Sequence, residues 1–168
     1  RPGDAVLDLA CGHGNFTVEW AKRAGPDGLV IGLDISMAML ARAARRVADR
    51  GLDNVLLIRG DALRLPLADA SVAKANCSGG FHQLPDLPRA LRELARVSAP
   101  GAALTASTFA SEPGDRREGV KRWIERRSDL HFVPLDWLGE QALTAGYRDY
   151  RWSLPGGWFG YVTATKGP

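Results

Sequence analysis

The sequence predicts an α/β fold with a doubly wound, mostly parallel sheet that ends in an antiparallel hairpin. Short apolar runs alternate with helical patterns, and the early runs are apolar throughout, as burial on both faces of a parallel sheet requires. The last two β-rich segments, within 147–166, are separated only by Pro155-Gly156-Gly157, which is too short for a helical crossover. We therefore expect helices on both faces of the sheet and an antiparallel pair at its end.

Five strand signals precede this hairpin. The first run ends in a turn that contains Gly12 and Gly14, and the fourth is the weakest because Lys74 interrupts it. The strands are expected over residues 5–10, 29–33, 55–58, 72–78 and 102–108.

The first two helices follow the first two strands. One helical pattern ends before Gly25-Pro26. The other begins after Ser36, a residue type that caps helices, and is expected to face Leu40, Ala44 and Val47 inward. This alternation of strand and helix is typical of a parallel sheet.

Two later helices have clear ends. Asp86 is the expected N-cap of the first, and Pro100-Gly101 is expected to stop it. The second is expected from about 135 to 145, closed by Gly146.

Composition limits the classes of protein to consider. The 168 residues suit one domain over 1–168, with 45% apolar and 24% charged residues. No apolar run approaches the roughly 18 residues of a membrane span, and no secretory leader is recognisable, so a cytoplasmic location is expected. Cys11 and Cys77 are too few for a disulfide framework and lack metal-ligand spacing, so we expect two free thiols and no zinc. A net charge of +3 is a weak argument for nucleic-acid binding.

Polar groups at three successive strand ends predict a nucleoside site. Gly12 and Gly14 let the backbone approach a ligand closely. Asp34 ends the second strand, where its carboxylate can accept hydrogen bonds from a ribose diol. Asp61 follows the third strand and can accept from an adenine amino group, while the Ala62 N–H donates to the ring. Each residue also has a purely structural interpretation, as a turn glycine or a capping carboxylate.

Ile35 and Leu63 follow Asp34 and Asp61 and could sandwich the base between them. Together, the three strand ends carry the groups that one adenosine ligand would need, in chain order.

Several segments resemble class I S-adenosylmethionine-dependent methyltransferases. Residues 6–14 (VLDLACGHG) resemble the first motif of that family, and 32–36 and 60–62 resemble the next two. Residues 81–86 and 91–101 are similar to the fourth-strand loop and the following helix of the ubiquinone/menaquinone-biosynthesis-like (methyltransferase type 11) subgroup. The resemblance spans nearly the whole chain. It implies a Rossmann-like sheet of seven strands with strand seven antiparallel, and methyl transfer from S-adenosylmethionine.

The resemblance also implies where the cofactor lies. The methionine moiety would lie over residues 8–14, with the ribose on Asp34 and the adenine at Asp61 and Ala62. The sequence departs from the family at Ala10, where a glycine is frequent, and at Ala73, where an acidic residue usually opens strand four. The candidate cofactor-binding residues are Asp8, Ala10, Cys11, Gly12, Gly14, Asp34, Ile35, Gly60, Asp61, Ala62, Leu63 and Asn76.

Methyl transfer needs little catalytic apparatus, because the sulfonium already makes the methyl group electrophilic. Alignment and exclusion of water should dominate, and a general base is optional. His82, after the fourth strand, is the candidate base, because histidine titrates near neutral pH. Its alternative role is a loop histidine that packs beside the cofactor or bonds to backbone.

The stretch from 115 to 128 combines several arginines with Val120, Trp123 and Ile124 in an amphipathic helical pattern. It follows the fifth strand and so lies on the expected acceptor side. It could cover a small-molecule acceptor or attract anionic substrates or membrane headgroups; a solvated helix is the alternative. The chain also begins almost directly on its first strand, so we expect that a leading lid segment found in many such domains is missing.

Two other functions compete with methyl transfer. An NAD(P)-dependent oxidoreductase would also place an acid 20 residues after Gly14, but the third glycine of a dinucleotide fingerprint is replaced by Thr17. A non-catalytic methyltransferase-like module could use the arginine-rich stretch on RNA, although few aromatic residues are interleaved there. The sequence leaves the identity of the acceptor, the methylated atom and the oligomeric state open.

Overall fold

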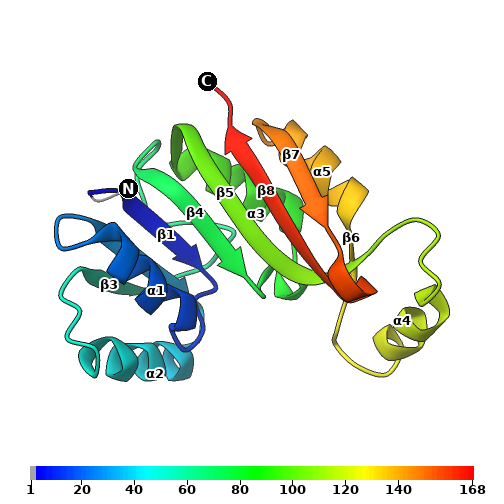
Figure 1. The fold of residues 1–168 in the computed structure, drawn as a ribbon, viewed down its shortest axis with the longest axis horizontal. Helices are drawn as coiled ribbons and strands as arrows, with labels where there is room; N and C mark the ends of the chain where they lie inside the picture. The colour runs from blue at the N-terminus through cyan, green and yellow to red at the C-terminus, as the bar shows by residue number, and fades with distance from the viewer. Residues whose placement is uncertain (1–2) are drawn as a thin grey trace.

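An eight-stranded sheet forms the centre of the computed structural model, which describes residues 3–168, and seven of its strands lie side by side (Figure 1). The strand order is β3-β2-β1-β4-β5-β8-β7. The first five are parallel neighbours, β8 is antiparallel to β5, and β7 is antiparallel to β8, so both the parallel sheet and the closing hairpin are confirmed. The strands are β1 (Ala5–Leu9), β2 (Leu29–Asp34), β3 (Val55–Arg59), β4 (Val72–Ser78), β5 (Ser98–Ser111), β7 (Tyr147–Ser153) and β8 (Phe159–Lys166).

Helices pack on opposite faces of this sheet because alternate strand residues point to opposite sides. Val6 and Val30 contact α1 on one face, whereas Leu7 and Ile31 belong to the large core that α3 and α5 cover on the other. Figure 1 shows α3 and α5 behind the sheet, with α1 and α2 on the β1–β3 side. The helices are α1 (Asn15–Ala24), α2 (Met37–Ala48), α3 (Leu87–Val97), α4 (Glu118–Glu125) and α5 (Leu135–Thr144).

Helical cover on both faces is correct for only part of the sheet. In Figure 1 the front of β4, β5, β8 and β7 is open to view, and within residues 3–168 no helix lies over it. Ala103, Tyr161 and Thr163 on this face are exposed. Most side chains of β5 and β8 on the open face are small or carry a hydroxyl, which makes that exposure tolerable in water, and Phe109 and Phe159 lie at the end of this face.

Three local expectations are wrong. Ala43 rather than Ala44 is buried in α2, because the helix turns Ala43 toward Gly14. Leu56 is 47% exposed because β3 is an edge strand, so its apolar run is not buried on both faces. The third helix ends at Val97, before Pro100, because β5 starts at Ser98 and pairs with Val72.

The carboxyl half contains small elements that the sequence did not predict. A two-residue strand, β6 (Val133–Pro134), pairs with the end of β5, and single 3₁₀ turns cover Phe81–Gln83 and Pro155–Gly157. The arginine-rich stretch forms α4, which lies out to one side of the sheet (Figure 1). Within residues 3–168, none of the helices has the length and apolar character that crossing a bilayer demands.

Candidate functional site

The turn after β1 joins the end of β2 at the carboxyl edge of the sheet. Gly12 and Gly14 adopt left-handed backbone conformations, with φ of 55° and 82°. The Gly12 N–H donates to Asp34 Oδ2 at 2.8 Å, and the Ser36 N–H donates to Oδ1 at the same distance. These bonds fix the plane of the carboxylate, while each oxygen keeps a further lone pair for a ligand hydroxyl. The first two predicted strand ends therefore converge.

Ala10, which replaces the glycine frequent in the family, is also left-handed, with φ of 53°. This conformation is unfavourable for a residue with a Cβ atom. The crowding is local: a Cβ added to Gly80 would approach that of Ala10 to 2.8 Å. The substitution thus keeps the shape of the turn at a cost in backbone strain.

The third strand end carries Asp61 on a tight turn. Asp61 Oδ1 accepts the Leu63 N–H at 2.8 Å, and the Arg64 N–H donates to the Asp61 carbonyl at 3.0 Å. Asp61 is exposed, so its carboxylate retains acceptor capacity toward solvent or a ligand. Both the structural and the ligand-binding interpretation are therefore compatible with this carboxylate.

Residues from all three strand ends line one hollow of about 260 Å³. Ile35 is 66% exposed and lies with Leu63 in its lining, which leaves apolar surface for a flat ring. Sequence reasoning gave no cofactor role to Gly80, Gln83 or Leu84, which line the hollow from the β4 side. Seven of the candidate residues line it: Ala10, Asp34, Ile35, Gly60, Asp61, Ala62 and Leu63.

The other candidate residues lie outside this lining. Asp8 is 1% exposed, accepts from Thr17 Oγ1 at 2.6 Å and from Asn76 Nδ2 at 2.7 Å, and so lies beneath the turn. Burial raises the pKa of the Asp8 carboxyl from 3.8 to about 6, against the opposing hydrogen bonds. Asp8 and Asn76 hold α1, β1 and β4 together below the hollow. The turn residues Cys11, Gly12 and Gly14 also fall outside the lining, although Gly12 touches the Asp34 carboxylate.

Cys11 and Cys77 are both buried free thiols. Burial raises the pKa of each thiol, and the nearby Asp8 carboxylate adds to the effect. Neither thiol is therefore activated as a nucleophile.

His82 lies in the 3₁₀ turn after β4 and lines a different hollow, next to the first. It is 8% exposed, so it is more buried than a residue at a crevice mouth. Desolvation, and to a smaller degree the charge of His131, lower the pKa of its imidazole. Its Nδ1 lies 3.3 Å from the Thr108 hydroxyl, a partner that the sequence did not reveal.

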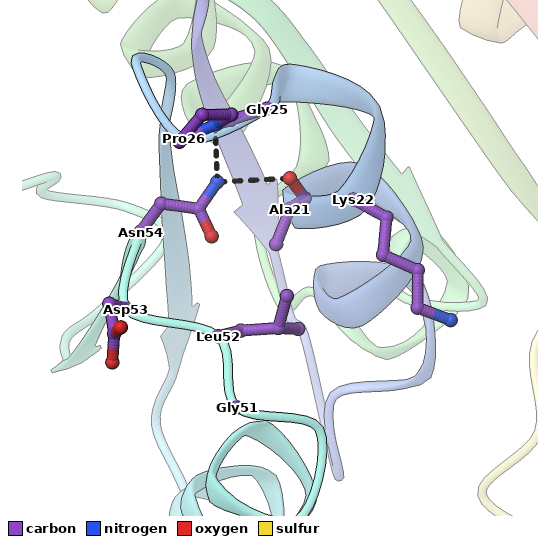
Figure 2. A pocket seen from close by; sticks show the side chains of 8 residues that line it. All are labelled: Ala21, Lys22, Gly25, Pro26, Gly51, Leu52, Asp53 and Asn54. Atoms are coloured by element: carbon purple, nitrogen blue, oxygen red, sulfur yellow. Dashed lines mark hydrogen bonds between the residues drawn. The ribbon is translucent and has the colours of Figure 1, made fainter.

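A third hollow, of about 350 Å³, lies at the opposite end of α1 (Figure 2). Figure 2 shows the Asn54 amide nitrogen bonded to two carbonyls at the end of the helix, Ala21 O at 2.9 Å and Gly25 O at 2.8 Å. Asn54 thus caps the C-terminus of α1, where orphan carbonyls need partners. This hollow is explained by helix capping.

The residues of the first hollow fit an adenosine moiety. Two strand-end carboxylates and two apolar side chains, Ile35 exposed and Leu63 half-buried, line the same space, and the Gly12 N–H reaches one of the carboxylates. Ligands of open α/β sheets bind at the carboxyl ends of the strands. Fold and site therefore define a Rossmann-like, nucleoside-binding class of protein.

Sequence comparison identifies the family. Residues 6–101 match the model of the methyltransferase domain family, and the chain belongs to that family. The match covers the turn, both carboxylates and α3, and ends just inside β5.

Similar proteins agree with this assignment. The demethylmenaquinone methyltransferase of Listeria monocytogenes is 39% identical over 152 residues, covering 90% of this chain and 61% of the relative. The 2-phytyl-1,4-naphtoquinone methyltransferase of Synechococcus elongatus is 46% identical over 105 residues, 61% of this chain and 44% of the relative. The chain spans about half the length of the curated relatives it matches.

A solved structure extends the likeness to the whole fold. A SAM dependent methyltransferase from Aquifex aeolicus is 26% identical, with a TM-score of 0.80, covering 98% of this chain and 83% of the other. The quinone-biosynthesis resemblance and the Rossmann-like fold are thereby confirmed.

Proposed function

We propose that residues 1–168 form one unit that binds S-adenosylmethionine and transfers its methyl group to a small molecule. The observation that carries this proposal is the convergence of Ala10, Asp34 and Asp61 on one hollow. In the proposed pose the ribose bonds to Asp34, and the adenine lies between Ile35 and Leu63 with its amino group toward Asp61. The methionine portion would follow the turn toward Gly12 and Gly14.

The acceptor is proposed to be a quinone-type ring compound. Relatives 39% and 46% identical to this chain carry the names demethylmenaquinone methyltransferase and 2-phytyl-1,4-naphtoquinone methyltransferase. A cytoplasmic site of action is part of the proposal, supported by two free thiols, which suit a reducing compartment.

When bound, S-adenosylmethionine supplies an electrophilic methyl group on a sulfonium, so the chain's own residues have mainly to orient and to exclude water. Well-oriented reactants gain roughly 7–11 kcal/mol relative to reaction in solution. Asp34 is held rigidly by the Gly12 and Ser36 N–H groups, which suits it for fixing the ribose and hence the direction of the methyl group. The Asp8–Asn76 pair holds the same turn from below.

Calorimetry tests the cofactor part of this proposal. S-adenosylmethionine should bind, whereas NADH and a short RNA should not. Tight NADH binding without S-adenosylmethionine binding would favour the oxidoreductase, and binding of RNA alone would favour the non-catalytic module.

The acceptor part needs a transfer assay. Labelled methyl groups from S-adenosylmethionine should appear in demethylmenaquinone, supplied in both its oxidised and its reduced form. Cofactor binding without transfer to either form would reject the quinone acceptor and leave the cofactor assignment standing.

A further inference from the structure

A hollow of about 500 Å³ lies next to the proposed cofactor hollow. Leu84 and Pro85 belong to both linings, so the 79–86 loop is the wall between them. Its other sides come from the start of α3, from β6 and from α5. The lining is mainly apolar and includes Phe81, Leu87, Phe132 and Trp137.

His82, a polar residue of this wall, has a hydrogen-bonding neighbour at each of its two ring nitrogens. The Thr108 hydroxyl donates to the Phe109 carbonyl at 3.2 Å, and it has only one hydrogen to give. His82 Nδ1 lies 3.3 Å from the same hydroxyl oxygen. When the hydroxyl hydrogen goes to the carbonyl, the oxygen accepts, and Nδ1 carries the ring hydrogen. Thr108 is fully buried.

The opposite side of the ring is consistent with this tautomer. The Gln83 amide nitrogen, which can only donate, lies 3.4 Å from His82 Nε2 and 3.5 Å from the Gly79 carbonyl. Its two hydrogens serve these two acceptors, so Nε2 holds a lone pair. The other tautomer would require the Gln83 amide to turn its oxygen toward Nε2.

The surroundings of the ring also keep it neutral. Phe109 meets it edge to face, with ring centroids 4.9 Å apart, and His131 is the titratable neighbour that acts on it. Thr108, Phe109 and Gln83 carry no charge. The imidazole is thus held as a neutral hydrogen-bond acceptor.

We propose that the second hollow receives the reacting end of the methyl acceptor, and that Thr108 and Gln83 are positioning residues that present His82 Nε2 to it. The acceptor's proton-bearing atom replaces the Gln83 amide at Nε2. That atom's electron pair forms the bond to the methyl carbon, the carbon–sulfur electron pair goes to sulfur, and the proton passes to Nε2. This inference rests on the proposed function, but the tautomer on which it depends can be measured without cofactor or acceptor.

Nitrogen-15 NMR of histidine-labelled protein at pH 7.5 tests the inference. The His82 Nε2 resonance should have the downfield shift of an unprotonated ring nitrogen, and Nδ1 that of a protonated one. Thr108→Val should shift both resonances toward the values of a mixed tautomer population, and Thr108→Ser should restore them. Thr163→Val, on the open face of the sheet, is the matched control and should leave them unmoved.

A protonated Nε2 in the wild-type protein, or unchanged populations in Thr108→Val, would overturn the inference. In the transfer assay, His82→Gln should lower the rate by about 10²-fold or more while changing the S-adenosylmethionine dissociation constant less than twofold. Unchanged transfer in that variant would also overturn it. Failure of S-adenosylmethionine to bind wild-type protein would instead reject the proposed function.

Discussion

The two sides of the carboxyl edge are built in different ways. On the cofactor side, backbone groups hold the site, such as the Gly12 and Ser36 N–H groups on Asp34. On the acceptor side, side chains from distant segments hold one another, such as His82 with Thr108. The family match, residues 6–101, covers the whole lining of the cofactor hollow and the 79–86 loop, but not Thr108, β6 or α4. The cofactor side thus depends mainly on backbone geometry at the strand ends, whereas the acceptor side depends on contacts between side chains.

Lys121 is the clearest case on the acceptor side. It is 2% exposed, donates to the Ala110 carbonyl at 2.6 Å and forms a close ion pair with Asp115. Its ammonium lies 5.2 Å from the centre of the Phe132 ring and 5.8 Å from that of Trp158. One buried charge pair thus attaches α4 to the sheet and the aromatic cluster.

The largest expected effect is a loss of affinity for S-adenosylmethionine on the cofactor side. Asp34→Ala removes a carboxylate that we expect to accept two ribose hydrogen bonds, and bonds to charged groups contribute roughly 1.5–3 kcal/mol each. The S-adenosylmethionine dissociation constant should therefore rise by about 10²–10⁴-fold in calorimetry. Asp53→Ala, in the hollow of Figure 2, should leave it unchanged. Equal affinities for both variants would remove Asp34 from the site.

The second-largest effect is a loss of stability of α4 on the acceptor side alone. Lys121→Met removes the closest cation of the buried Asp115 carboxylate and leaves only the more distant Arg117 guanidinium, 3.8 Å away, which is strongly unfavourable. Amides of α4 should exchange hydrogen at least about 100-fold faster, while cofactor binding is retained. Arg122→Met, at a position whose side chain is 62% exposed, is the control and should change exchange little. If the loss of Lys121 also abolished cofactor binding, the two sides would not be separate.

The next prediction concerns the pH dependence of folding stability that Asp8, below the glycine turn, should cause. The folded-state pKa of Asp8 is raised from 3.8 to about 6, so folding favours its protonated form. This stabilisation is complete below pH 3.8 and is lost as pH rises through about 6. At 1.36 kcal/mol per pKa unit, the loss between pH 4 and pH 7 is about 2–3 kcal/mol.

Urea unfolding at the two pH values measures this loss. Asp8→Asn should lessen the fall in the free energy of unfolding between the two pH values by about 2–3 kcal/mol, whereas Asp53→Asn should leave that fall unchanged. An equal change in the free energy of unfolding between the two pH values in the wild type and in Asp8→Asn would contradict the raised pKa of Asp8.

The smallest effect concerns the strained turn. Ala10→Gly should stabilise the protein by about 0.5–1 kcal/mol, because relief of a left-handed alanine exceeds the added flexibility of the unfolded chain. Ala44→Gly, on the exposed side of α2, should instead destabilise it by about 1 kcal/mol. Thermal unfolding distinguishes the two signs, and a loss of stability in Ala10→Gly would contradict the strain argument.

Much of the fold could be predicted because its signals are local. The caps Ser36 and Asp86 both accept the expected backbone bonds, from Met39 and Arg89. What failed needed knowledge of neighbours: the edge position of β3, which exposes Leu56, and the early start of β5 at Ser98. The open face of β4 and β5 likewise depends on which elements lie above it, which no local pattern reports.

The candidate site divides in the same way. Residues that line the hollow, such as Asp34 and Asp61, follow their strands directly and could be placed from sequence. Asp8 lies below the turn, bonded to Thr17 and Asn76, which no local pattern reports, and its contact with a ligand stays a prediction. The relation of His82 to Thr108, 26 residues apart, required the pairing of β4 with β5.

A crystal structure with bound S-adenosylhomocysteine would test the central claim most directly. We predict the ribose hydroxyls within hydrogen-bonding distance of Asp34 and the adenine between Ile35 and Leu63. The account would be contradicted if the adenosine lay in another hollow, or if the carboxylates of Asp34 and Asp61 faced solvent without contacting the ligand.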